Sequence, residues 1–189
     1  MIKTLELKRF KKFEHTTIEL GELSILVGEN SSGKTTILQA INLALHSFSR
    51  MKLYSTINGV AKPRSKGVGC RELPGILNHD FRELYYAKKS RGGQNGSGAI
   101  GAELFLTDDK SNCFGIQISS LFGGYNITPL SKASQISNAP ELHQKEALLI
   151  SGFVGLSSSE EKTLSLSLRN RLRDGRANEI IRNLLLDTK

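Results

Sequence analysis

The residues with the clearest chemical meaning lie in one short stretch, GENSSGKTT, at positions 28–36. Gly28, Gly33, Lys34 and Thr35 match the pattern GxxxxGK[ST], in which each fixed residue has a mechanical role. The glycines let the backbone turn so that amide N–H groups converge on one anion, and the lysine adds a positive charge. This combination is typical of a loop that binds the phosphates of a nucleoside triphosphate.

Individual contacts can be assigned within this loop. Lys34 is expected to reach the β- and γ-phosphates and to act in catalysis, and the Thr35 hydroxyl is expected to bind Mg²⁺. Thr36 is the expected contact of the α-phosphate. Hydroxyls and backbone N–H groups supply the remaining contacts, so the predicted phosphate-binding residues are Asn30, Ser31, Ser32, Gly33, Lys34, Thr35 and Thr36.

A loop of this kind needs a strand before it and a helix after it. Residues 23–27, LSILV, are a short apolar run typical of a buried parallel strand. After Lys34 the apolar residues recur at three- and four-residue spacing, which predicts an amphipathic helix over 34–48. The positive end of this helix would lie behind the phosphates. Its predicted apolar positions are Ile37, Leu38, Ile41, Leu45 and Phe48.

The rest of the chain predicts strands first and helices last. Alternating patterns indicate strands at 2–7 and 16–20. The segment 52–100 is expected at the surface, with one short helix around HDFRELYYA. Residues from about 92 to 130 predict a small antiparallel β-subdomain at one edge, with turns at DDKSN and LFGGYN. A buried strand at 147–150 and a helical segment of two helices over 157–187, beginning with a capping box, complete the prediction.

Composition limits the class of protein. At 189 residues, with 23% charged and 38% hydrophobic residues, the chain is predicted to form one globular domain. The net charge of +8 favours polyanionic partners, although a solvated basic surface explains it about equally well. Cys70, Cys113 and the four scattered histidines show neither disulfide nor zinc spacing. Without a signal-peptide pattern or a long apolar run, a cytoplasmic protein with no membrane contact is expected.

The position of the loop separates the families that use it. No NKxD tetrapeptide is present to read guanine, which argues against a GTPase. The loop follows a strand, the turn Phe10-Lys11-Lys12-Phe13 and a second strand. This order resembles the head of ABC-type ATPases of the structural-maintenance-of-chromosomes (SMC), RecF and OLD (overcoming lysogenization defect) group, in which OLD-like members often have a residue such as Ser31 in place of a common glycine. The resemblance is firm over 1–48 and looser over ALLISGFVGLSSSEEKTLS and RANEIIRNLLLD.

That resemblance implies an α/β fold, a P-loop NTPase core forming the N-terminal half of an ABC-type AAA ATPase head. The phosphate-binding core would span 1–50. In this group ATP binding and hydrolysis drive head dimerisation, which implies a homodimer or larger assembly, DNA, a nuclease domain or partner, and a role in DNA repair or antiviral defence. It also implies that Lys11 and Lys12 lie near the phosphates or ribose, the alternative being a solvated turn. Phe10 and Phe13 are expected to pack in the core rather than on the base.

Three parts that the resemblance calls for are not found in this sequence. Hydrolysis needs a carboxylate pair after an apolar strand. Asp108 and Asp109 follow AELFLT, but DDKSN predicts a turn, so no general base is identified. LFGGYN lacks the serine of the signature motif, and SGFVGLSSSEE lacks the expected glutamine. We therefore expect these parts to be supplied beyond this chain, as in an incomplete domain over 1–189.

Three other functions remain open at this point. An ABC transporter subunit would carry an LSGGQ helix, which the sequence lacks. A small-molecule kinase would use arginines over the phosphates, and those at 64, 71, 82 and 91 are available. A non-catalytic module would use ATP only to order its structure.

Overall fold

The computed structural model describes residues 1–51, 53–57, 60–70, 72–73, 76, 80–92 and 98–130, with isolated positions at 147, 167–168, 171, 180 and 183. The chain divides into two units, Met1–Glu146 and Ala147–Lys189. The first unit contains all of the sheets and the helix that carries the phosphate loop, and the description below concerns that unit.

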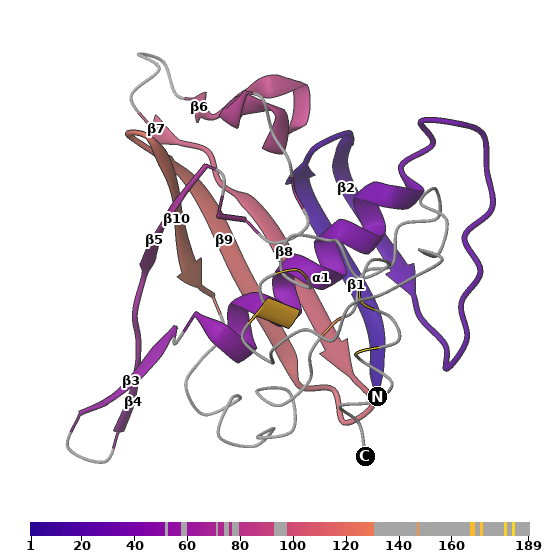
Figure 1. The fold of residues 1–189 in the computed structure, drawn as a ribbon, viewed down its shortest axis with the longest axis horizontal. Coiled ribbons are helices and arrows are strands. Elements are labelled where there is room, and N and C mark those ends of the chain that lie inside the picture. The colour runs from indigo at the N-terminus through magenta and orange to yellow at the C-terminus, as the bar shows by residue number, and fades with distance from the viewer. Residues whose placement is uncertain are drawn as a thin grey trace. The chain divides into compact units, whose positions relative to one another are not determined.

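A six-stranded antiparallel sheet is the centre of the first unit (Figure 1). Its strand order is β2-β1-β8-β9-β10-β5, so the first strand of the chain, β1, pairs with a strand about 100 residues later, β8. The strands are β1 (Ile2–Phe10), β2 (Phe13–Glu19), β5 (Lys66–Gly69), β8 (Ala102–Asp108), β9 (Cys113–Leu121) and β10 (Gly124–Pro129).

The other elements are one long helix, two ribbons and two short 3-10 helices. The helix is α1 (Lys34–Arg50). The ribbons pair β3 (Tyr54–Ile57) with β4 (Val60–Pro63), and β6 (Arg91–Gly92) with β7 (Gly98–Ala99). The 3-10 helices are η1 (Phe81–Leu84) and η2 (Tyr86–Lys88), where one helix was predicted. The segment 52–100 was predicted to lie at the surface. That prediction is wrong in part, because Leu53, Leu84 and Tyr85 are buried.

The buried face of the sheet forms the core. Because side chains alternate along a strand, every second residue of three neighbouring strands points to this face. The helix α1 contacts the sheet at β8 and β9, and the Phe48 ring meets Phe114 edge-on with centroids 5.7 Å apart. The fully buried residues of these strands include Leu5, Leu7, Leu104, Leu106, Ile116 and Ile118.

The predicted helix is confirmed, but its buried stripe differs from the predicted one. Leu38 is 44% exposed, whereas Ala40, Leu43, Ala44 and Ser47 are completely buried. Small residues add little to a hydrophobic pattern, yet they bury well because they allow close packing. Leu45 and Phe48 are buried as predicted.

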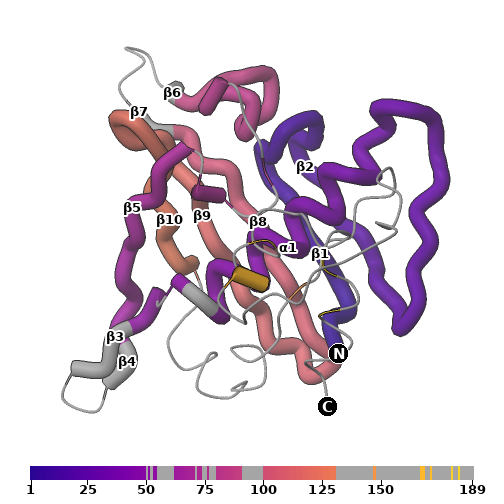
Figure 2. The backbone as a smooth tube through the Cα atoms, in the orientation of Figure 1, coloured from indigo at the N-terminus to yellow at the C-terminus, as the bar shows by residue number. Residues whose placement is uncertain are grey.

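The apolar run at 23–27 is not the predicted buried strand. Leu23, Ile25 and Val27 are 82%, 78% and 89% exposed, and no strand of the described residues pairs with this run. Figure 2 shows the connection from β2 to α1 as a long excursion away from the sheet. A short apolar run becomes a buried strand only where neighbouring strands satisfy its backbone groups, and the described part of the chain provides none there.

The predicted β-subdomain forms part of the central sheet. Strand β8 pairs with β1 along six residue pairs, so residues 102–129 share one sheet with the N-terminal hairpin rather than standing at its edge. Long-range pairing of this kind leaves no local signal in a sequence. The turns predicted at DDKSN and LFGGYN are confirmed as the β8–β9 and β9–β10 connections. Apart from residue 147, the strand predicted at 147–150 lies outside the described residues, and so does nearly all of the helical segment 157–187.

The opposite face of the sheet carries paired charges. Glu6 Oε1 is 2.8 Å from His15 Nε2 on β2 and 3.1 Å from Lys8 Nζ. Partial burial alone would raise the pKa of the Glu6 carboxyl, but the hydrogen bonds from His15 and Lys8 outweigh it and hold that pKa below its usual value.

Glu6→Gln should make stability less sensitive to acid. A lowered folded pKa contributes stability above the ordinary value of 4.5, and that contribution is lost as pH falls through the folded pKa. Because these side chains are partly exposed, the effect should be below about 1 kcal/mol. Urea unfolding over a series of pH values measures it, with Glu14→Gln, an exposed carboxyl on the same hairpin, as control. Equal acid dependence in both variants would contradict the assignment.

Candidate functional site

The phosphate loop connects the exposed run to the first turn of α1. Gly33 is the N-cap residue of the helix, with φ of 106°, and its carbonyl accepts the N–H of Ile37. Ser31 also has a left-handed backbone, with φ of 64°. Two residues with a left-handed backbone, Ser31 and Gly33, therefore precede the helix. Glycine adopts that conformation without strain.

Lys34 folds back over its own loop. Its Nζ donates to the carbonyls of Gly28 and Glu29, both at 2.7 Å, and lies 3.3 Å from Ser32 Oγ. The ammonium is thus held at the loop that GxxxxGK[ST] predicts as the phosphate cradle, beside the positive end of a 17-residue helix. A cation and a helix N-terminus at one loop suit a phosphate group, and the phosphate-binding role of the residues from Asn30 to Thr36 stays a prediction.

The turn between β1 and β2 packs directly on the loop. A Cβ atom on Gly33 would lie 2.6 Å from Phe13 Cζ and 2.8 Å from Lys12 Cδ, which is closer than side chains tolerate. Lys12 Nζ also donates to the Ser31 carbonyl at 2.6 Å. Lys12 therefore lies at the loop. Phe10 is completely buried, as expected, whereas the Phe13 ring is only partly buried and packs against Gly33 of the loop rather than in the core.

Lys11 connects the turn to other elements rather than to the loop. Its Nζ donates to Gln39 Oε1 of α1 at 2.8 Å, and its backbone N–H donates to the Leu84 carbonyl at 2.8 Å. Burial lowers the pKa of the Lys11 ammonium, and the nearby Glu83 carboxylate opposes that shift. Lys11 thus ties the turn to α1 and η1, whereas its neighbour Lys12 reaches the loop.

Arg9 is a site-supporting residue that the sequence did not reveal. Its φ of 53° lies in the left-handed region, where a side chain is strained. The guanidinium compensates by donating to the Gly101 carbonyl and to Glu103 Oε1, both at 2.9 Å. Arg9 thereby fixes the end of β1 against β8, immediately before the turn that holds the loop. The basic stretch KRFKK was the only hint of this role.

Asp108 and Asp109 are both occupied within the β8–β9 turn. Asp108 accepts the backbone N–H groups of Lys110 and Asn112 and the amide of Asn112. Burial alone would raise the pKa of Asp108, but these hydrogen bonds from Asn112 and Lys110 outweigh it and lower that pKa. Asp109 Oδ1 pairs with the N-terminal ammonium at 2.8 Å.

These carboxylates also lie at the wrong end of the sheet. Asp108 pairs with Ile2 at the start of β1, whereas the phosphate loop contacts the turn after Phe10, at the end of that strand. Eight residues of β-strand span roughly 26 Å. The prediction that DDKSN is a turn is confirmed, and both carboxylates lie about a strand length from the loop that contains Thr35, the predicted contact of Mg²⁺.

In the described part of the chain, no group of three or more His, Cys, Asp or Glu side chains could hold a metal ion. None of its helices has both the length and the apolar character needed to cross a membrane.

Comparisons with known proteins agree with this geometry. The family described as "AAA ATPase domain" matches residues 1–154. Over 45 residues the chain is 49% identical to the OLD nuclease of Thermus scotoductus (strain ATCC 700910 / SA-01). That match covers 24% of this chain and 8% of the nuclease, so the chain corresponds to a small part of that relative's length.

Gly33→Ala should weaken nucleotide binding strongly. The added Cβ would collide with Phe13 and Lys12 at a left-handed position, so the loop or the turn must shift. We expect an affinity loss of about tenfold or more, equivalent to about 1.4 kcal/mol. Titration with a fluorescent ATP analogue and Mg²⁺ measures it.

Gly123→Ala is the matched control for this change. Gly123 has φ of 76°, but nothing lies within 4 Å of its added Cβ. This variant should carry about 1 kcal/mol of backbone strain and bind the analogue normally. If the two variants bind alike, the packing of the turn on the loop does not control the site.

Proposed function

The chain belongs to the AAA ATPase domain family, and on this basis we propose that it binds ATP with Mg²⁺ at the loop 28–36 and forms the nucleotide-binding half of an ATPase head. ATP binding and hydrolysis by the assembled head would drive the association of two heads. Residues of this loop would bind the nucleotide, and residues outside the described part of the chain would supply part of the hydrolytic site.

One observation carries the nucleotide-binding part. Lys34 and the N-terminus of α1 converge on a loop whose shape depends on Gly33 and on the turn packed against it. Charge-assisted hydrogen bonds from such donors are the strongest that a protein offers a phosphate. Lys34 would bind the β- and γ-phosphates, Thr35 would ligate Mg²⁺, and Lys12 would donate a second ammonium from the turn.

The exposed run at 23–27 supports the incomplete character of the head. The run exposes three large apolar side chains, and its backbone N–H and C=O groups pair with no described strand. Proteins normally cover an exposed apolar edge of this kind, because it readily pairs with another strand. We propose that strands from outside the described residues pair with this run. The same strands are the expected source of the carboxylate that activates water, since Asp108 and Asp109 are engaged elsewhere. They could come from another segment of the protein or from another chain.

The finer role follows from the relatives. Local identity to an OLD nuclease and the resemblance of the first 48 residues to the SMC, RecF and OLD group support an ATPase that works with DNA and with a nuclease domain or partner. DNA repair and antiviral defence are the biological roles proposed from that likeness, and the cytoplasm is the proposed location.

Other functions predict different behaviour. A small-molecule kinase would transfer phosphate with these 189 residues alone, and a non-catalytic module would bind ATP without turnover in any assembly. An ABC transporter subunit would need a membrane partner. The placement of Asp108 about a strand length from the loop argues against the kinase, because phosphoryl transfer usually needs a carboxylate close to the nucleophile.

Lys34→Ala should remove most of the nucleotide affinity. The lost charge-assisted hydrogen bond is worth about 1.5–3 kcal/mol, or roughly 10- to 150-fold in dissociation constant. Titration with a labelled ATP analogue and Mg²⁺ measures it. Lys3→Ala, which removes an exposed lysine on β1, is the control and should bind normally. Unchanged binding by Lys34→Ala would contradict the assignment of the loop.

Steady-state turnover tests the division of the hydrolytic site. The 189-residue chain should bind ATP but hydrolyse it no faster than a Lys34→Ala control does, with or without duplex DNA. Asp108→Asn should leave that background unchanged. Turnover that Asp108→Asn abolishes would show that this carboxylate is catalytic and that the head is complete in this chain.

A further inference from the structure

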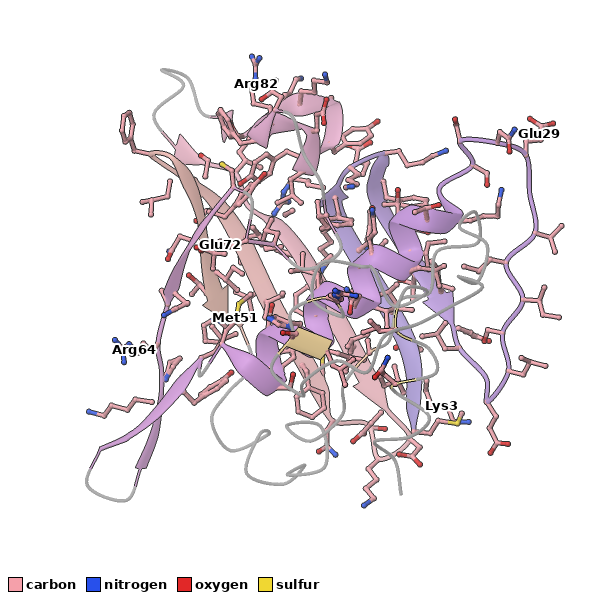
Figure 3. All side chains as sticks on the ribbon, viewed as in Figure 1. Lys3, Glu29, Met51, Arg64, Glu72 and Arg82 are labelled. Atoms are coloured by element: carbon pink, nitrogen blue, oxygen red, sulfur yellow. The ribbon has the colours of Figure 1, made fainter. Side chains whose placement is uncertain are left out.

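Three cations line the passage from the β3–β4 ribbon into the central sheet. The three residues occupy alternate positions of the chain, and all are exposed. They are Lys62 on β4, Arg64 between the two strands, and Lys66 at the start of β5. Figure 3 shows Arg64 pointing outward from this passage, on the opposite side of the view from Glu29 of the phosphate loop. We call Lys62, Arg64 and Lys66 the basic row.

The three side chains of the basic row have no internal partner in the described part of the chain. Within the described residues, none of its three side chains makes a salt bridge or hydrogen bond. By contrast, carboxylates lie within 4 Å of the basic groups of Lys8, Arg9, Arg82 and Lys88. A cluster of like charges without counter-charges destabilises the folded chain slightly, so an external anion would relieve it.

The neighbouring elements supply no acidic residue either. The sequence has no Asp or Glu between Glu29 and Glu72. The strands that flank the row, β3 and β10, also contain none. Glu72 itself is engaged, because its Oε2 accepts the backbone N–H of Gly69 at 2.9 Å. No charge on the strands that adjoin the row therefore offsets its positive charge.

The backbone holds the row in an extended shape. Arg64 N–H donates to the Leu53 carbonyl at 2.7 Å, and Ser65 Oγ lies 2.9 Å from Thr128 Oγ1. Strand β5 then pairs with β10. Alternate residues of an extended chain are about 7 Å apart, so the cations are spaced along a line rather than gathered at a point. A linear polyanion matches such a line better than a single small anion does.

From these observations we infer that the basic row is a second binding surface, separate from the phosphate loop, and that it contacts the backbone phosphates of duplex DNA. The choice of DNA as the polyanion rests on the proposed function. A membrane surface fits less well, because residues 62–67 carry no large apolar side chain to enter a bilayer. Contacts to phosphates would position DNA without reading its sequence.

The test compares two triple variants with equal charge. Lys62→Gln, Arg64→Gln and Lys66→Gln together remove the row. Lys3→Gln, Lys89→Gln and Lys110→Gln together remove three other exposed cations. Binding to a fluorescent DNA duplex is measured by anisotropy from roughly 50 to 200 mM salt, where each phosphate contact contributes about 0.9 to the slope of log affinity against log salt.

The inference predicts that the row variant loses about two to three units of this slope, whereas the control variant keeps the wild-type slope. Equal losses in both variants would overturn it, because general charge would then account for binding. Wild-type protein that binds anionic vesicles but not DNA would also overturn it. Titration with the ATP analogue, run on the same samples, tests the proposed nucleotide function separately.

Discussion

The structure of the candidate site depends on one close contact, in which the Phe13 ring and the Lys12 side chain rest where a Cβ of Gly33 would be. Gly33 begins α1, and the turn of Phe13 belongs to the central sheet. Position 33 must therefore satisfy two demands, a left-handed backbone and the absence of a side chain, which only glycine meets. Through this contact the sheet sets the position of the phosphate loop.

The turn that makes this contact is itself held under strain. Arg9 and Lys11 both have positive φ, and each is compensated by a long-range contact, Arg9 with β8 and Lys11 with α1 and η1. Strain of this kind persists only where surrounding contacts over-determine it, and it is common at functional sites.

The basic residues of the described part of the chain fall into two groups. Some are fixed by internal partners around the loop, and others, such as Arg64, face outward without one.

The first unit holds the predicted phosphate loop at one end of β1 and an engaged carboxylate pair at the other. Beside the loop runs an apolar segment, Leu23 to Val27, that is competent to pair but exposed. These features fit an ATPase head in which binding and hydrolysis are divided between segments. Pairing along 23–27 would bring new strand ends next to the loop, where a catalytic carboxylate is needed. Assembly would then control turnover, since neither part would be sufficient alone.

The sequence by itself determined the local features. The pattern from Gly28 to Thr35, the helix that follows and the turns at DDKSN and LFGGYN all follow from interactions between residues close in the chain, which periodicity and turn chemistry report. The pairing of β1 with β8, the burial of Ala40 and Ala44, the role of Arg9 and the exposure of Ile25 were decided only by the tertiary structure. These depend on residues that are distant in sequence, and an apolar run cannot specify whether a partner strand is present to bury it.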